Sequence, residues 1–410
     1  MRPGVLSPAP AACAAVLLFQ ISALAQPLAG DLAPIAAEDW NARSAAHLLE
    51  RAGFGGTPEE IARLAAMTPQ AAVRHLVRYQ NLADELPPFD ESGAHDPGLE
   101  PFAPSRPAAT DLAKKTGEAL GVKVKPSGNR RLQPVADRFF YWLRASRLET
   151  HRLGYWWANR MLNSRRPLEE KMALFWHGHF ATSEEKVRDY RKMYLQNQLF
   201  RRAGTGNFRT LLIGVAQDPA MLAFLDAAVN IKGSPNENFA REIMELFTMG
   251  VGNYTEQDIK NAARAFTGWT CAQPIPLYPY GFYPTTFVYR EDDHDDSVKT
   301  FLEQTGRLNG EDIVHIIVQQ PATARFISRH LYNFFVADEP QVPAWGSMPP
   351  QDPQAIDALV QAYHDGGGDI RAMLRVLFNA DFFKQARFRK VKSPVEFVVG
   401  TIKLAGTHRF

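Results

Sequence analysis

The sequence predicts an all-α protein, a multi-helix body with helical hairpins, a small β-hairpin insert and a long Pro/Gly-rich loop near the N-terminus. The first observation is the helical spacing of apolar residues after Pro167, at Leu168, Met172, Phe175 and Trp176. The second is the stretch 234–269, which resembles two amphipathic helices separated by Gly250 and Gly252. The third is that 274–305, rich in Tyr, Phe and Pro, lacks the helical period.

The N-terminal 25 residues have the pattern of a signal peptide. An apolar run over 11–24 is followed by Ala23-Leu24-Ala25, a small-x-small sequence typical of signal-peptidase cleavage. We therefore expect export to the periplasm or the cell exterior; the alternative is a disordered, alanine-rich tail. The mature chain would keep a single cysteine, Cys271, which leaves no partner for an intramolecular disulfide. No later segment is apolar enough to span a bilayer.

The rest of the chain divides into three parts by composition. We expect an N-terminal helical segment over 26–83, a Pro/Gly-rich linker or excursion over 84–133, and a main helical domain over 134–410. The chain has 46 Lys and Arg against 44 Asp and Glu, a formal charge of +2. So small an excess gives no reason to expect a nucleic-acid or acidic-membrane partner.

The first helix of the 234–269 stretch carries a dense polar face. Ser234 and Glu237 have the spacing of a capping box, with Pro235 at the first helical position. One face is expected to be buried and holds Phe239, Ile243, Leu246, Phe247 and Gly250. The opposite face holds Asn238, Arg241, Glu242 and Glu245. These are either a solvated face with a local Arg241–Glu245 pair, or carboxylates that line a pocket.

The β-hairpin is expected around an acidic turn. The strands would be 286–289 and 298–302, paired antiparallel, with 291–296 between them. The turn imitates a calcium loop that starts at Asp292, but Ser297 stands where such a loop needs glycine. We therefore expect a solvated hairpin turn.

His177 and His179, inside the stretch 175–187, raise the question of a metal site. On a helix, residues two apart point about 200° apart and cannot share an ion, whereas on a strand they lie on one side. The helical spacing places His179 on the apolar stripe below Trp176 and leaves His177 beside Glu170 and Ala173. The alternatives are a hydrogen-bonded aromatic core at a helix end, a polar pocket and a metal site. No nucleophile-elbow, zinc-protease, phosphate-loop or paired-cysteine motif occurs.

Several long stretches resemble the exported bacterial family called domain of unknown function 1800. They are Phe175-Trp-His-Gly-His-Phe-Ala-Thr-Ser183, Asn236 through Gly250, Ala265-Phe-Thr-Gly-Trp269, His294-Asp295 with Lys299-Thr-Phe-Leu302, and Lys392-Ser-Pro-Val-Glu396. The resemblance implies a large, secreted, mostly helical protein with no settled activity. It also implies a shared envelope task with exported proteins that resemble alkaline phosphatases and sulfatases. Family members usually continue beyond the last of these stretches with a Pro- and Trp-containing segment, so a fragment or a frameshifted product is one interpretation of this chain.

The resemblance gathers the motif residues into one candidate constellation, which is either functional or a buried polar network. It consists of His177, His179, Asn238, Arg241, Glu242, Glu245, Trp269, His294 and Asp295. We expect an envelope protein that binds a partner protein, such as the phosphatase- or sulfatase-like one, or a surface polymer. The alternative is a hydrolase of envelope polymers that uses His177, His179, Asn238, Arg241, Glu242 and Glu245. The sequence requires no cofactor; a divalent metal, with His177, His179, His294 and Asp295 as candidate ligands, belongs to the alternative. If these side chains lie together in one open pocket, the enzyme is favoured. If they are scattered or buried in paired contacts, the binding protein is favoured.

Overall fold

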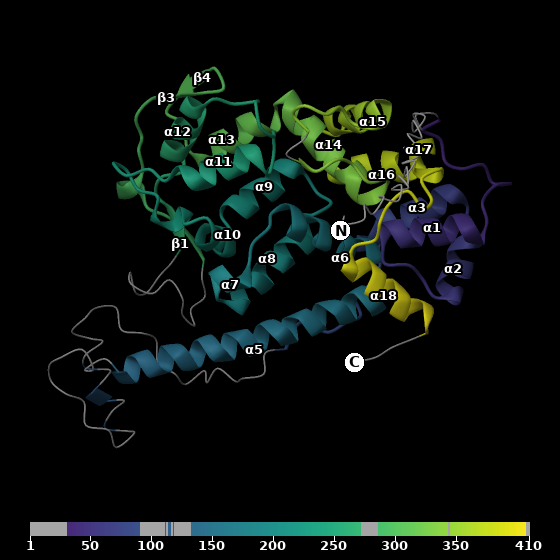
Figure 1. The fold of residues 1–410 in the computed structure, drawn as a ribbon, viewed down its shortest axis with the longest axis horizontal. Coiled ribbons are helices and arrows are strands. Elements are labelled where there is room, and N and C mark those ends of the chain that lie inside the picture. The colour runs from purple at the N-terminus through teal and green to yellow at the C-terminus, as the bar shows by residue number, and fades with distance from the viewer. Residues whose placement is uncertain are drawn as a thin grey trace, which may run out of the picture.

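The long helix α5 (Gln133–Asn163) runs along one edge of the molecule, and the other helices are stacked to one side of it (Figure 1). The computed structural model describes residues 31–90, 133–271, 286–342 and 345–406, with 111, 114, 115 and 118. The expected signal peptide and most of the expected linker lie outside the described residues. The described residues are mainly helical with two small antiparallel strand pairs, which confirms the all-α fold.

The N-terminal helices each begin at a side-chain cap. Asn41 accepts from two backbone N–H groups of α1, and threonines followed by proline cap α2 and α3. Helix α3 packs against α16, so these helices share the main hydrophobic core rather than forming a separate body. Their bounds are α1 (Ala42–Ala52), α2 (Pro58–Ala65), α3 (Pro69–Val77) and the 3-10 turn η1 (Tyr79–Asn81).

The central helices follow α5 and enclose the largest aromatic side chains. Helix α6 begins at Pro167, as the sequence predicts, and packs against α8. Trp176 is wholly buried, and its Nε1–H donates to the Gly204 carbonyl at 2.7 Å. The bounds are α6 (Pro167–His179), α7 (Glu184–Val187), α8 (Tyr190–Ala203), α9 (Phe208–Ala216), α10 (Pro219–Phe224) and the 3-10 turn η2 (Ala227–Val229).

Helices α11 (Glu237–Glu245) and α12 (Glu256–Ala265) form the expected helical hairpin. The predicted cap of the first helix is wrong, because Asn236 rather than Ser234 accepts from the first backbone N–H groups. Asn236 is held there by Asn230 and by the Asp226 carbonyl. Phe247 is buried as predicted, but Leu246 is 47% exposed, since the helix ends before it and the chain turns away.

The predicted pairing of the two strands is also wrong. Strand β2 (Phe287–Tyr289) pairs with β1 (Trp269–Cys271), and β3 (Lys299–Phe301) pairs with β4 (Gln304–Gly306) through a tight turn. Between β2 and β3, the acidic stretch forms the 3-10 turn η3 (Glu291–Asp293) and is fastened to the end of α12. There the His294 Nδ1 contacts the Thr267 carbonyl at 2.9 Å, and the Asp295 N–H donates to the Thr267 hydroxyl at 2.7 Å. Because these bonds hold residues 294 and 295 against Thr267, strand β2 does not turn back to pair with β3.

The remaining helices close the core and return the chain to α5. Helix α14 packs against α15, α15 against α16, and α18 against α5. No helix in the described residues is both long and apolar enough to cross a membrane. The bounds are α13 (Gly310–Val318), α14 (Pro321–Phe335), α15 (Pro353–Asp365), α16 (Ile370–Asn379), α17 (Asp381–Lys384) and α18 (Pro394–Leu404).

Candidate functional site

An open pocket of about 510 Å³ lies where α6, α10, α11 and α14 meet. Its walls are mostly apolar, and its polar side chains are His179, Glu242, His330 and Asn333. The stretches around the two histidines and on α11, far apart in the sequence, both supply lining residues. A concave, mainly apolar surface with a few convergent polar groups is the usual form of a ligand site. The apolar lining residues are Leu174, Phe175, Ala181, Phe224, Leu225, Leu246, Phe247, Phe334 and Val342.

His179, the last residue of α6, ties that helix to the end of the α11 segment. Its Nε2 lies 2.9 Å from the Phe247 carbonyl, which can only accept, so Nε2 carries the hydrogen. In the neutral ring, Nδ1 is then an acceptor, and this buried atom has no partner among the described residues. Burial lowers the pKa of His179 to about 4, against the smaller opposing effect of the Phe247 bond. The ring is therefore neutral near neutral pH.

His330, on α14, is a pocket residue that lies in none of the sequence motifs. Its ring centroid lies 4.7 Å from that of His179, edge to face, and Phe326 and Trp345 flank it. Its Nε2 is buried without a hydrogen-bond partner in the described structure. Burial, and then the neighbouring His179 and Arg329, hold the pKa of His330 well below its ordinary value. The pocket thus holds two neutral imidazoles with unused hydrogen-bonding capacity.

Glu242 is the acidic residue of the pocket. It lies on α11 and is half-buried. Partial burial, and then the negative charge of Glu245, raise the pKa of its carboxyl, whereas Arg241 opposes the shift. A carboxyl group with a raised pKa in a pocket that also holds neutral imidazoles is suited to hydrogen bonding and to proton transfer.

The structure directs the other residues of the predicted constellation elsewhere. His177 packs edge-to-face on Trp157, with ring centroids 5.5 Å apart. The Asn238 amide donates to the Leu225 carbonyl at 3.2 Å, and Glu245 accepts from the Tyr254 hydroxyl at 2.7 Å. Arg241 forms a bidentate pair with Glu256, at 2.9 and 2.8 Å. These contacts leave only His179 and Glu242 of the six proposed catalytic residues in the pocket lining.

The remaining candidates lie at the end of α12. Trp269 is buried against Phe266, and Asp295 pairs with Arg264 at 2.8 Å. His294 is buried at the same place, apart from His177 and His179. Among the described residues, no group of three or more His, Cys, Asp or Glu side chains is placed to hold a metal ion.

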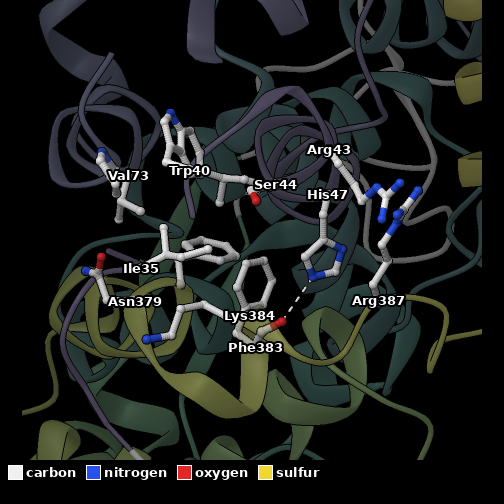
Figure 2. Close-up of a pocket in the computed structure, with 13 residues that line it drawn as sticks. Ile35, Trp40, Arg43, Ser44, His47, Val73, Asn379, Phe383, Lys384 and Arg387 are labelled. Atoms are coloured by element: carbon white, nitrogen blue, oxygen red, sulfur yellow. Dashed lines mark hydrogen bonds between the residues drawn. The ribbon is translucent and has the colours of Figure 1, made fainter. Parts of the chain in front are cut away.

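A smaller cavity of about 120 Å³ lies between α1, α3 and α17. Figure 2 shows His47 turned toward the Phe383 carbonyl, which its Nε2 contacts at 3.0 Å, with Arg43 and Arg387 beyond it. His47 also stacks on the Phe383 ring, at a centroid distance of 4.7 Å. None of the candidate residues from the sequence analysis lines this cavity. Its walls come from the N-terminal helices on one side and from the α17 segment on the other.

Comparison with protein-family models decides the membership of the chain. The model described as "Protein of unknown function (DUF1800)" matches residues 47–410. The chain belongs to this family. All residues that line the 510 Å³ pocket lie within the DUF1800 match. No curated protein and no solved structure matches the chain.

Proposed function

We propose that the protein is an exported envelope protein that binds a segment of a partner protein or surface polymer in the 510 Å³ pocket. The observation that carries the proposal is the pair His179 and His330, each with one buried ring nitrogen that lacks a partner. A buried polar atom without a hydrogen bond destabilises a fold, and a ligand that supplies the bond removes that cost. Four of the six candidate catalytic side chains are engaged elsewhere, which favours binding over catalysis.

The lining specifies the chemistry of the bound segment. The walls are apolar and aromatic, so the segment has an apolar body. His179 Nδ1 is an acceptor that is buried in the unbound protein, so neighbouring side chains must move for an N–H or O–H group of the segment to reach it. Because both imidazoles are neutral near pH 7, they do not attract anions by charge. The first candidate partner is the exported phosphatase- or sulfatase-like protein.

The test is co-purification of the secreted full-length protein with its partners, using a variant that fills the pocket. Leu246 lines the pocket and is 47% exposed, so Leu246→Trp blocks the site without disturbing the core. Val251→Trp is the matched control, because Val251 is 64% exposed and lies outside the pocket lining. We expect Leu246→Trp to lose the co-purifying partner and Val251→Trp to keep it. Equal recovery from both variants would overturn the proposal.

The raised pKa of Glu242 supports a second function, hydrolysis of envelope polymers. In this alternative, Glu242 is the general acid and His179 or His330 positions the substrate. Glu242→Gln keeps the size of the side chain and removes the exchangeable proton. Loss of polymer cleavage by Glu242→Gln with retained partner binding would establish the enzyme, whereas absence of cleavage by the wild type would exclude it.

A further inference from the structure

A second open groove, of about 460 Å³, lies between the end of α3 and the start of α16. These two helices pack against each other (Figure 1). Arg74 and Arg78 reach the groove from the α3 segment, and Arg371 and Arg375 from α16. The groove shares no lining residue with the 510 Å³ pocket.

The four guanidinium groups have no acidic partner in the described structure. The one carboxylate in the lining, Asp369, accepts from the Ala372 N–H at 3.1 Å and so caps α16. Arginine stays protonated near neutral pH, so the groove carries a concentrated positive charge. In a chain whose formal charge is only +2, this concentration is local rather than a general basic character.

The placement of Arg371 and Arg375 works against the stability of α16, whereas Arg74 and Arg78 lie at the C-terminal end of α3, where the helix dipole favours cations. Each pair is spaced i,i+4, where like charges repel each other. Arg371 lies in the first turn of α16, which has no acidic residue and where the helix dipole disfavours a cation. Residues that destabilise their own elements without a compensating ion pair are typical of binding sites.

Arg371 is also held in position with unused hydrogen-bonding capacity. Its Nη2 donates to the Thr205 hydroxyl at 2.8 Å, and Tyr79 contacts the same hydroxyl at 3.0 Å. Its Nε is shielded from solvent and has no acceptor among the described residues. The planar guanidinium group is therefore oriented by Thr205, while a donor on the same group remains unsatisfied.

We propose that Arg74, Arg78, Arg371 and Arg375 form a binding site for a phosphate group. Arginine forks bind phosphate oxygens in pairs of parallel, charge-assisted hydrogen bonds, and two helices that each present two arginines can surround one group. The phosphate belongs either to a soluble polymer or to a lipid head group. This proposal is independent of the ligand in the 510 Å³ pocket.

The test is calorimetric titration of the full-length protein with pyrophosphate at constant ionic strength, with sodium chloride as the reference titrant. Arg74 and Arg375 are exposed and have no side-chain bond in the described structure, so Arg74→Gln/Arg375→Gln spares the fold. We expect this double variant to raise the Kd for pyrophosphate at least about tenfold, which equals about 1.4 kcal/mol. Arg202→Gln, at an exposed arginine of α8 outside the groove, should leave the Kd unchanged.

Thermal melts without anion separate a binding role from a structural one. The double variant relieves like-charge repulsion but removes a cation from the last turn of α3, so its Tm should be close to that of the wild type. Soluble polyphosphate and phosphatidylglycerol vesicles, with phosphatidylcholine vesicles as the control, then identify which source of phosphate is bound. No binding of pyrophosphate, polyphosphate or phosphatidylglycerol vesicles above the controls would overturn the proposal. Equal weakening by Arg202→Gln, or an unchanged Kd in the folded double variant, would do the same.

Discussion

Two imidazoles, His179 and His330, dominate the chemistry of the 510 Å³ pocket because each is half-buried and has one buried ring nitrogen without a partner in the described structure. Their low pKa values keep them uncharged, so hydrogen-bond geometry rather than charge selects what they bind. Aromatic rings pack around His179: Phe175 and Trp176 from its own helix, and Phe247 from the segment after α11.

The two histidines of α6 are expected to differ in their importance for stability. His179→Ala removes the bond to the Phe247 carbonyl and leaves a void, and we expect the free energy of unfolding to fall by roughly 2–4 kcal/mol. His177→Ala loses only an edge contact with Trp157 and should cost about 1 kcal/mol or less. Urea denaturation of both variants, with and without a chelator, measures the difference. Suppose that both variants were as stable as the wild type without chelator, and that the chelator destabilised the wild type but neither variant. The two histidines would then form a shared metal site.

Burial of His179 also predicts a pH dependence of stability. Its pKa is about 4 in the folded protein and near 6.5 when exposed, so the unfolded state binds more protons between these values. The contribution of His179 to stability is therefore constant above about pH 6.5 and falls by up to about 3 kcal/mol as the pH drops to about 4. His179→Gln removes the titrating group, so its loss of stability between pH 7 and pH 5 should be smaller. An equal loss in wild type and variant would show that His179 does not contribute.

At the scale of elements, the pocket exists because α11 stops at Glu245. The chain then turns, so that Phe247 points into the core while Leu246 lines the pocket. A helix continued to Gly250 would place both side chains on the buried face, as the sequence predicts. Because α11 ends at Glu245, Leu246 leaves the buried apolar face and lines the pocket instead.

A pair of truncations tests this arrangement. Phe247 is 4% exposed, so Phe247→Ala should lower the free energy of unfolding by roughly 3–5 kcal/mol. Leu246→Ala, at a half-exposed position, should cost less than about 1 kcal/mol. Chemical denaturation of the two variants gives both values. Similar losses would mean that the helix continues and that Leu246 is buried.

At the scale of the whole molecule, a buried charged cluster joins distant segments behind the pocket. Glu396 of α18 pairs with Lys171 of α6 and with Arg51 of α1, the latter at 3.3 Å. Arg51 also donates to the Phe334 and Phe335 carbonyls at the end of α14. Burial raises the pKa of Glu396, but the positive charges of Lys171 and Arg51 outweigh this effect and lower it to about 2. For Lys171 burial is the larger effect, and it lowers the pKa to about 8 despite the attraction of Glu396. The cluster thereby positions α14, which carries His330 and Asn333.

Removing the charge of Glu396 should be costly. Glu396→Gln keeps a capping side chain for α18 but leaves Lys171 and Arg51 buried without a counter-charge. We expect a loss of roughly 3–5 kcal/mol in the free energy of unfolding. Glu256→Ala, which breaks the exposed pair with Arg241, should leave the denaturation midpoint near that of the wild type. Thermal and urea denaturation of both variants measure the contrast, and equal effects would refute a structural role for the cluster.

The sequence by itself determined the features that depend on neighbouring residues. The start of α6 at Pro167 follows from local chemistry, and the structure confirms it. The helical course through His177 and His179, which turns the two rings apart, follows from the same apolar spacing. Long motifs also indicated the family, which the match over 47–410 confirms.

Tertiary structure alone decided which distant side chains meet. His330 has no motif, and α14 brings it to His179 across 151 positions of sequence. Strand pairing was mispredicted because Thr267 fastens the acidic stretch to α12, a contact between segments that local patterns do not encode. Likewise, Asn230 and Asp226 select Asn236 over Ser234 as the cap of α11. Local propensities differ by about 1 kcal/mol or less, so one long-range hydrogen bond or buried ring is enough to override them.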